Sequence, residues 1–143
     1  MARGGMGIGE VLKLTLNDIE DRKLLLREPK SGKERGVVFI PQKCCNRLHS
    51  FAIGARSSPD DRIFPIPCKA ARVIVAKAGK MVDIHLRPHD LRRHAATYES
   101  RSGVPIEIIS KVILRHANLS TTQRYFDTIS DHEAIRWIEN IYG

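Results

Sequence analysis

Strand-forming residues are concentrated in one short part of this sequence, which confines any sheet to a small region beside helices. Residues 24–26 predict a strand, "PKSGKER" (29–35) predicts a turn with Gly32 at its tip, and "GVVFIP" (36–41) predicts a β-branched returning strand that ends at a proline. The chain has no internal repeat and no low-complexity segment. We therefore predict an α+β, mainly α fold: a small antiparallel hairpin or sheet followed by a helical body.

Apolar residues at spacings of three and four predict the helices of that body. The second of them, in the segment 68–80, is expected to close at Gly79, a glycine of the kind that ends helices. The fourth should bury one stripe, formed by Ile106, Ile109 and Ile113 and widened by Ile108 and Val112. After a short helical stretch at 10–15, the predicted helices cover residues 42–55, 68–80, 89–103, 104–116, 120–126 and 130–143.

Composition restricts the functional class. At 143 residues the chain suits one domain, and its 42% apolar content allows a substantial core. No run of about 18 apolar residues indicates a membrane span, and no secretory signal is visible. Three cysteines argue against a disulfide framework and favour a reducing cytoplasm. The net charge of +8 favours a polyanionic partner such as nucleic acid, although a basic protein without a special partner has the same balance.

The segment "PHDLRRHAA" places two anion-binding side chains on one helix face. His89 and Arg92 are three residues apart and lie in the first turns, where the helix dipole also favours an anion. An imidazole and a planar guanidinium could grip a phosphate there. The alternative is a solvated basic face.

Two further segments carry candidates for chemistry on a phosphodiester. In "LRHANLSTTQRYF", His116 precedes Tyr125 by nine residues, and a phenol becomes a useful nucleophile only beside groups that stabilise developing charge. Buried packing of the tyrosine is the alternative. In "PKSGKER", Lys30 or Lys33 could present an ammonium at the hairpin tip as a general acid, or could simply keep the hairpin solvated.

Taken together and in order, these segments resemble the catalytic domain of the tyrosine recombinase, or phage integrase, family. The resemblance is carried by "HDLRRHAAT" and "LRHANLSTTQRYF", with "GIGEVLKLTLNDIE" and "PKSGKERGVVFIP" before them, and covers about residues 4–140. It implies attack of Tyr125 on a phosphate of double-stranded DNA, a 3′-phosphotyrosyl link and a released 5′-hydroxyl. Neither a metal nor another cofactor is implied.

The resemblance also implies a role for each site residue. Arg92 matches the second clamp arginine, His89 the histidine that begins that motif, and His116 the later histidine that holds a phosphate oxygen. Lys30 matches the general acid, and Glu10 an acid that supports the site. Further contacts to DNA are expected from Lys33, Arg93 and Arg115.

One departure lies in the glycine cluster at the start of the chain. Gly7 stands where the resemblance expects the first catalytic arginine. A dinucleotide-binding loop does not explain these glycines, because Glu10 occupies the place of its third glycine. Losing one charge-stabilising donor costs about a hundred- to thousandfold in rate. We therefore expect impaired cleavage that Gly7→Arg improves, unless Arg3 substitutes.

The resemblance leaves several alternatives open. We expect residues 1–143 to be one catalytic domain without the N-terminal DNA-clamping domain, so that binding depends mainly on phosphate contacts. The last helix could pack on its own domain or on a neighbouring protomer in a DNA-bound tetramer. A non-catalytic DNA-binding remnant, a topoisomerase-like variant and a structural RNA- or DNA-binding protein with a buried Tyr125 are the competing interpretations.

Overall fold

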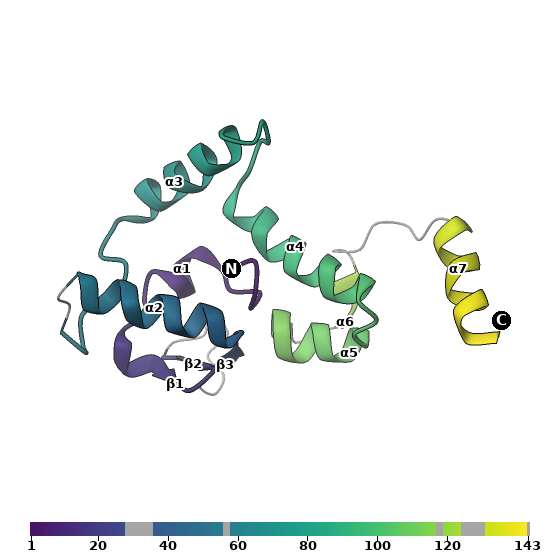
Figure 1. The fold of residues 1–143 in the computed structure, drawn as a ribbon, viewed down its shortest axis with the longest axis horizontal. Helices are drawn as coiled ribbons and strands as arrows, with labels where there is room; N and C mark the ends of the chain where they lie inside the picture. The colour runs from purple at the N-terminus through teal and green to yellow at the C-terminus, as the bar shows by residue number, and fades with distance from the viewer. Residues whose placement is uncertain (28–35, 56–57, 117–118, 124–130, 143) are drawn as a thin grey trace.

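The computed structural model describes residues 1–27, 36–55, 58–116, 119–123 and 131–142. A three-stranded antiparallel sheet forms early in the chain, and the residues after it are mainly helical (Figure 1). The predicted fold class, mainly α with a small sheet, is confirmed. The elements are α1 (Ile8–Val11), a 3₁₀ turn η1 (Leu16–Asp18), β1 (Ile19–Glu20), β2 (Lys23–Leu26), β3 (Gly36–Phe39), α2 (Gln42–Gly54), α3 (Cys68–Lys80), α4 (Pro88–Arg101), α5 (Ile106–Ile108), a π-helix η2 (Ile109–Leu114), α6 (Leu119–Gln123) and α7 (Asp131–Tyr142).

Strands β2 and β3 form the predicted hairpin. Leu24 pairs with Val38 and Leu26 with Gly36 in an antiparallel register, and β1 adds a short edge to β2. Because side chains alternate along a strand, Leu24, Leu26 and Val38 all point into the core and are buried. The turn that carries Gly32 lies outside the described residues.

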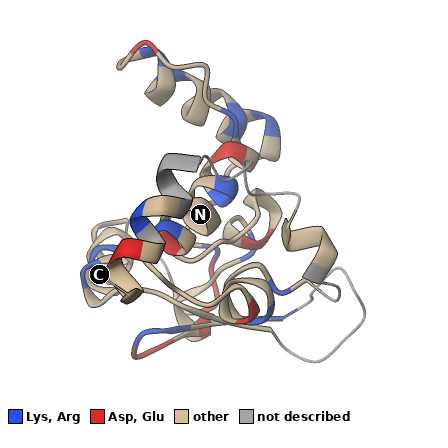
Figure 2. Ribbon diagram, turned by 90° about the vertical axis from the view of Figure 1, so that its right-hand side faces the viewer, with Lys and Arg blue, Asp and Glu red and all other residues tan. Residues whose placement is uncertain are grey.

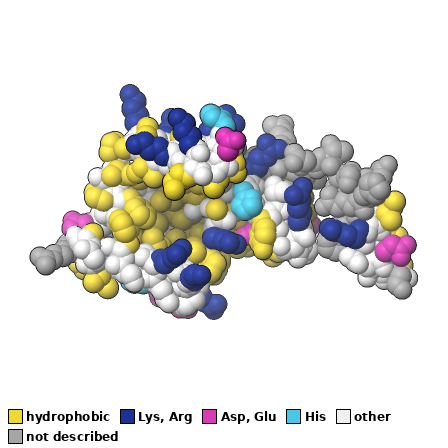
Figure 3. All heavy atoms as spheres, turned by 45° about the horizontal axis from the view of Figure 1, so that its top comes forward, with side chains coloured by type: hydrophobic (Ala, Val, Ile, Leu, Met, Phe, Trp, Pro, Cys, Tyr) yellow, Lys and Arg dark blue, Asp and Glu magenta, His cyan; other side chains and the backbone are white. Residues whose placement is uncertain are grey.

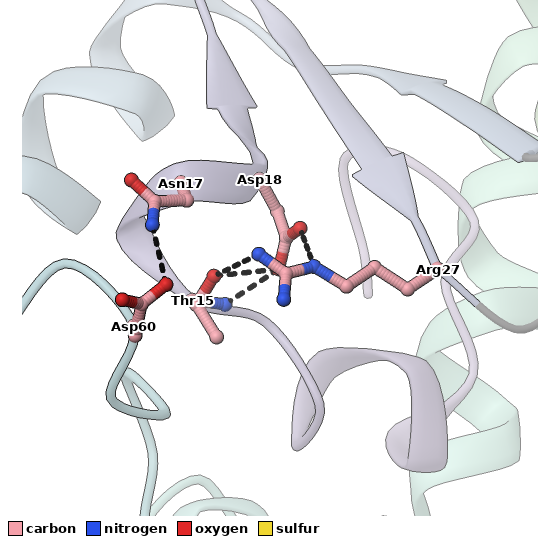
Figure 4. A network of polar contacts seen from close by, with 5 residues as sticks. All are labelled: Thr15, Asn17, Asp18, Arg27 and Asp60. Carbon is pink, nitrogen blue, oxygen red and sulfur yellow. Dashed lines mark hydrogen bonds and ion pairs between the residues drawn. The ribbon is translucent and has the colours of Figure 1, made fainter.

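A buried carboxylate fixes the strand at the base of that hairpin (Figure 4). Asp18 accepts hydrogen bonds from the backbone and hydroxyl of Thr15, both at 2.9 Å, and from Arg27 Nε at 2.5 Å. The Asp18 side chain is only 4% exposed, so these charge-assisted bonds offset its desolvation. They hold β2 in place up to the last described residue before the hairpin turn.

Two groups of buried apolar side chains form the cores. The first lies between the sheet, the N-terminal segment and α2, and includes Met6, Leu24, Val38, Cys45 and Ala52. The second lies between α4 and η2, and consists of Ala96, Ile109 and Leu114 with partly buried neighbours. The candidate site residues come from both sides of the boundary between these groups.

The segment 104–116 differs from its prediction. A single α-helix was expected, but a short α5 leads into the π-helix η2, in which Ile109 and Leu114 are both fully buried. Their spacing of five residues is the span of the i→i+5 hydrogen bond that defines a π-helix, and the buried stripe does not follow the 3.6-residue period of an α-helix. Ile108, predicted to widen the stripe, is 46% exposed.

Two helix boundaries also differ from their predicted positions. The short helix predicted at 10–15 is α1, which begins at Ile8 and ends at Val11. The helix in the segment 68–80 was expected to close at Gly79, but α3 continues to Lys80. Gly79 instead allows a close approach, because a Cβ there would lie 2.5 Å from both Ile84 O and Leu86 Cβ.

Helix α7 stands apart from the other helices in Figure 1. Its side chains Ile135, Ile138, Ile141 and Tyr142 are each more than half exposed. Within the described residues, no helix has the length and apolar content needed to cross a bilayer. All three cysteines are free thiols.

Candidate active site

Glu10 is the centre of a small charged cluster. Its Oε2 accepts a hydrogen bond from Gly7 N at 2.7 Å and one from an Arg115 guanidinium nitrogen at 2.8 Å, and an Arg92 guanidinium nitrogen lies 3.7 Å away. The side chains of Glu10, Arg92 and Arg115 are 24%, 16% and 15% exposed. One partly buried carboxylate is therefore shared by two guanidinium groups, and the cluster carries excess positive charge.

Arg92 connects helix α4 to the end of η2. One of its terminal nitrogens donates to Leu114 O at 2.5 Å, and this bond orients the guanidinium toward Glu10. The next residue, Arg93, lies on an exposed part of α4, because one residue turns the helix by about 100°. Arg92 therefore belongs to the cluster, whereas Arg93, expected to contact DNA, lies at the surface.

Arg115 adopts a left-handed backbone conformation, with φ 54° and ψ 40°. Glycine takes this conformation readily, whereas residues with a Cβ rarely do. One guanidinium nitrogen donates to Ile113 O at 2.9 Å, and another reaches Glu10. Burial lowers the pKa of Arg115 from its ordinary value, and the neighbouring Arg92 lowers it further, whereas Glu10 opposes both effects.

His116 follows directly and is fixed by two buried hydroxyl groups. Its backbone N–H donates to Ser110 O, and its Nδ1 lies 2.9 Å from Thr122 Oγ1, which donates to Ser110 Oγ at 2.8 Å. Burial lowers the pKa of His116, and the charges of Arg92 and Arg115 lower it further. A bound anion would counteract both charges.

The other predicted site residues fall into two groups. His89 lies in the first turn of α4, one turn before Arg92, and is exposed. Lys30, Lys33 and Tyr125 lie outside the described residues, so their assigned roles stay predictions.

Gly7 has room for a larger side chain. A Cβ built on it would lie 3.7 Å from Glu10 Oε2 and 3.9 Å from an Arg92 nitrogen, both ordinary contact distances. A side chain at position 7 would therefore begin directly beside the charged cluster. Arg3, the other candidate for the missing cation, instead places its guanidinium carbon 5.8 Å from the centre of the Tyr98 ring.

Sequence reasoning missed how tightly Arg115 is bound into this cluster. Arg115 and Glu10 are 105 residues apart, and no local pattern signals an ion pair over that separation. The buried Ser110 and Thr122 that orient His116 were missed too, because isolated hydroxyl residues carry no signal of their own. Within the described residues, no three metal-binding side chains of the His, Cys, Asp or Glu type come together.

The charges of the molecule are mixed rather than separated into halves. Lysines and arginines occur along most helices, with acidic residues among them (Figure 2). On one face, apolar side chains line a hollow between α2 and α3, and basic side chains border it (Figure 3).

Comparison with known proteins relates the chain to a family. Tyrosine recombinase XerA from Pyrococcus horikoshii is 31% identical over 157 aligned residues, which cover 97% of this chain and 53% of the relative. A crystal structure of XerA recombinase superposes with a TM-score of 0.79 at 23% identity, covering 99% of this chain and 53% of that one. The Tn1549 transposon integrase, solved with transposon right end DNA, has the same TM-score at 13% identity and covers 99% and 56%.

The chain spans about half the length of the curated relatives it matches. The sequence model of the phage integrase family matches residues 1–132, which include every predicted site residue. On this match and on the identity with XerA, the chain belongs to the phage integrase family.

Proposed function

We propose that this chain carries the chemistry of a site-specific DNA recombinase, which cleaves and rejoins DNA strands in recombination or integration. The observation that carries the proposal is the convergence of Arg92, from α4, and Arg115, from the end of η2, on Glu10, with His116 next to Arg115 in the chain and influenced by both arginines. Two guanidiniums and an imidazole form a setting suited to a phosphate anion. Family membership and the DNA complex of the Tn1549 integrase support the same assignment.

In the proposed reaction, the Tyr125 phenol gives up its proton to water and its oxygen attacks the scissile phosphorus. The bond to the 5′-oxygen breaks, Lys30 donates a proton to that oxygen, and a 3′-phosphotyrosyl ester remains. Arg92, His89 and His116 bind the non-bridging oxygens, where negative charge grows in the transition state. A 5′-hydroxyl of a partner strand then reverses the step. The ester conserves the bond energy, so the reaction consumes no ATP.

Covalent capture of DNA tests this proposal. A nicked suicide duplex loses its short 5′-hydroxyl fragment after cleavage, so the protein–DNA ester accumulates and migrates as a larger species on a denaturing gel. We expect such an adduct with the unaltered chain and none with Tyr125→Phe, which keeps the ring and removes the nucleophile. The target sequence is supplied by screening duplexes that the chain binds.

Other results would favour the competing functions. Duplex binding with a steep salt dependence but no adduct indicates the non-catalytic DNA-binding remnant. An adduct that survives in Tyr125→Phe overturns the assignment of the nucleophile. A preference for RNA together with no adduct indicates the structural nucleic-acid-binding protein. The cytoplasmic location expected from the cysteines is part of the same proposal.

We also propose that α7 joins copies of the chain on DNA. Ile135, Ile138 and Tyr142 follow the spacing of one helix face and are exposed, so α7 presents an apolar surface that a neighbouring protomer could cover. We expect a monomer without DNA and a tetramer on duplex DNA by light scattering. Ile138→Glu should leave DNA-bound monomers, while Glu139→Gln, on the next residue, should leave the tetramer intact. A DNA-bound tetramer of Ile138→Glu contradicts the proposal.

A further inference from the structure

The guanidinium of Arg115 is held close to that of Arg92, where both could bind one anion. Its side chain comes from the end of η2, yet it reaches Oε2 of Glu10 on α1, the same oxygen that Arg92 approaches from α4. Two cations thus share one anion in a partly buried cluster. Like charges at such short range repel in a medium less polar than water, and an additional anion between them relieves the repulsion.

Both guanidiniums also keep N–H donors that no described residue engages. A guanidinium has five N–H groups. Among the described residues, Arg115 donates to Glu10 and Ile113 O, and Arg92 donates to Leu114 O. Each side chain remains about 15% exposed, so each can reach a bound group at the surface. The contacts therefore orient the two groups and leave N–H donors for a planar or tetrahedral oxyanion.

Gly7 lies beside the same charged cluster. Its hypothetical Cβ lies within 4 Å of Glu10 Oε2 and of Arg92, so an arginine side chain there would start beside the carboxylate that Arg115 already contacts. Arg115 is moreover held in a left-handed conformation that its Cβ disfavours, with φ 54°. This conformation directs its side chain into the cluster.

From this arrangement we propose that Arg115 clamps the phosphate beside Arg92 and supplies the cation that Gly7 lacks. It binds a non-bridging oxygen of the scissile phosphate together with Arg92, while Glu10 orients both guanidiniums. The proposal rests on the proposed function, because it assigns a residue to the phosphate site of that reaction. It also modifies the expected impairment: Gly7→Arg alone changes cleavage little.

A set of four proteins tests the proposal: the unaltered chain, Arg115→Gly, Gly7→Arg and the double variant. Glycine is chosen at 115 because it keeps the left-handed backbone. In covalent capture, we expect Arg115→Gly to lower the cleavage rate about a hundred- to thousandfold. The double variant should recover at least a tenth of the original rate. Arg22→Gly, which removes one exposed positive charge from the β1–β2 turn, should keep full activity.

A neutral substrate separates phosphate binding from a purely structural role. Replacing one non-bridging oxygen of the scissile phosphate by methyl removes the charge that Arg115 is proposed to bind. The rate ratio between the unaltered chain and Arg115→Gly should then fall at least tenfold. The proposal is overturned if the rate ratio is the same on both substrates. It is also overturned if Arg115→Gly cleaves normal DNA within threefold of the unaltered chain, or if the double variant cleaves no faster than Arg115→Gly.

Inorganic phosphate provides a readout that does not need cleavage. We expect saturable shifts of the His116 ring resonances on phosphate addition, with affinity reduced at least tenfold in Arg115→Gly and recovered in the double variant. If no protein forms a DNA adduct but these affinities behave as expected, the proposed function fails and the assignment of Arg115 stands. Equal phosphate affinity in all four proteins overturns the assignment even where DNA is cleaved.

Discussion

Replacing Arg92 with alanine is expected to lower the rate of DNA cleavage by about a hundred- to thousandfold, the cost of removing one charge-stabilising donor from a transition state. Arg92 is partly buried beside Glu10, and its bond to Leu114 O directs its remaining donors toward the cluster. The measurement is single-turnover cleavage of the nicked duplex at saturating protein, so that weaker DNA binding does not enter the rate.

Two variants control this experiment. Arg92→Lys keeps the charge but loses the planar, two-pronged guanidinium, so its rate should lie between those of alanine and arginine. Arg101→Ala removes an exposed arginine from the last turn of the same helix and should cleave normally. Full activity in Arg92→Ala, with folding confirmed by circular dichroism, would exclude Arg92 from the phosphate site.

Gly5→Ala is expected to destabilise the fold by about 2–5 kcal/mol, the sum of a left-handed alanine and an overpacked contact. Gly5 has φ +59°, and a Cβ there would lie 2.6 Å from Ile113 O. That carbonyl also accepts a hydrogen bond from Arg115, so displacing it disturbs the candidate site as well. Urea unfolding followed by circular dichroism measures the loss of free energy.

Gly9→Ala is the matched control, made four residues later. No atom lies within 4 Å of a Cβ at Gly9, and the residue is exposed within α1. Alanine should therefore leave the free energy of unfolding unchanged or raise it by up to about 1 kcal/mol. Equal losses at Gly5 and Gly9 would contradict the close approach of Gly5 to Ile113.

The sequence predicted those parts of the fold that depend on local periodicity. The hairpin strands, α2 and α4 appear close to their predicted bounds, because their apolar spacing matches the side of each element that is buried. The π-helix could not be predicted, since the isoleucines of residues 104–116 fit an α-helical stripe equally well. Strand β1 is two residues long and exists only through its pairing with β2.

The site was partly predictable for a different reason. The family resemblance implied that Glu10, Arg92 and His116 belong to one site, and the structure brings Glu10 and Arg92 within 3.7 Å of each other. The position of Arg115 depends on a left-handed residue and on an ion pair to a distant helix. Both arise from tertiary packing, which leaves no trace in residue spacing.

The candidate site lies where two separate cores meet, and this couples ligand binding to the integrity of the whole domain. Glu10 comes from the segment packed with the sheet, whereas Arg92 and Leu114 come from the core between α4 and η2. A phosphate held across that boundary is bound only when both parts are assembled. By mass action, a ligand at one hundred times its dissociation constant adds about 2.7 kcal/mol to the assembled state. Bound nucleic acid would thus stabilise the folded domain in addition to being the proposed substrate.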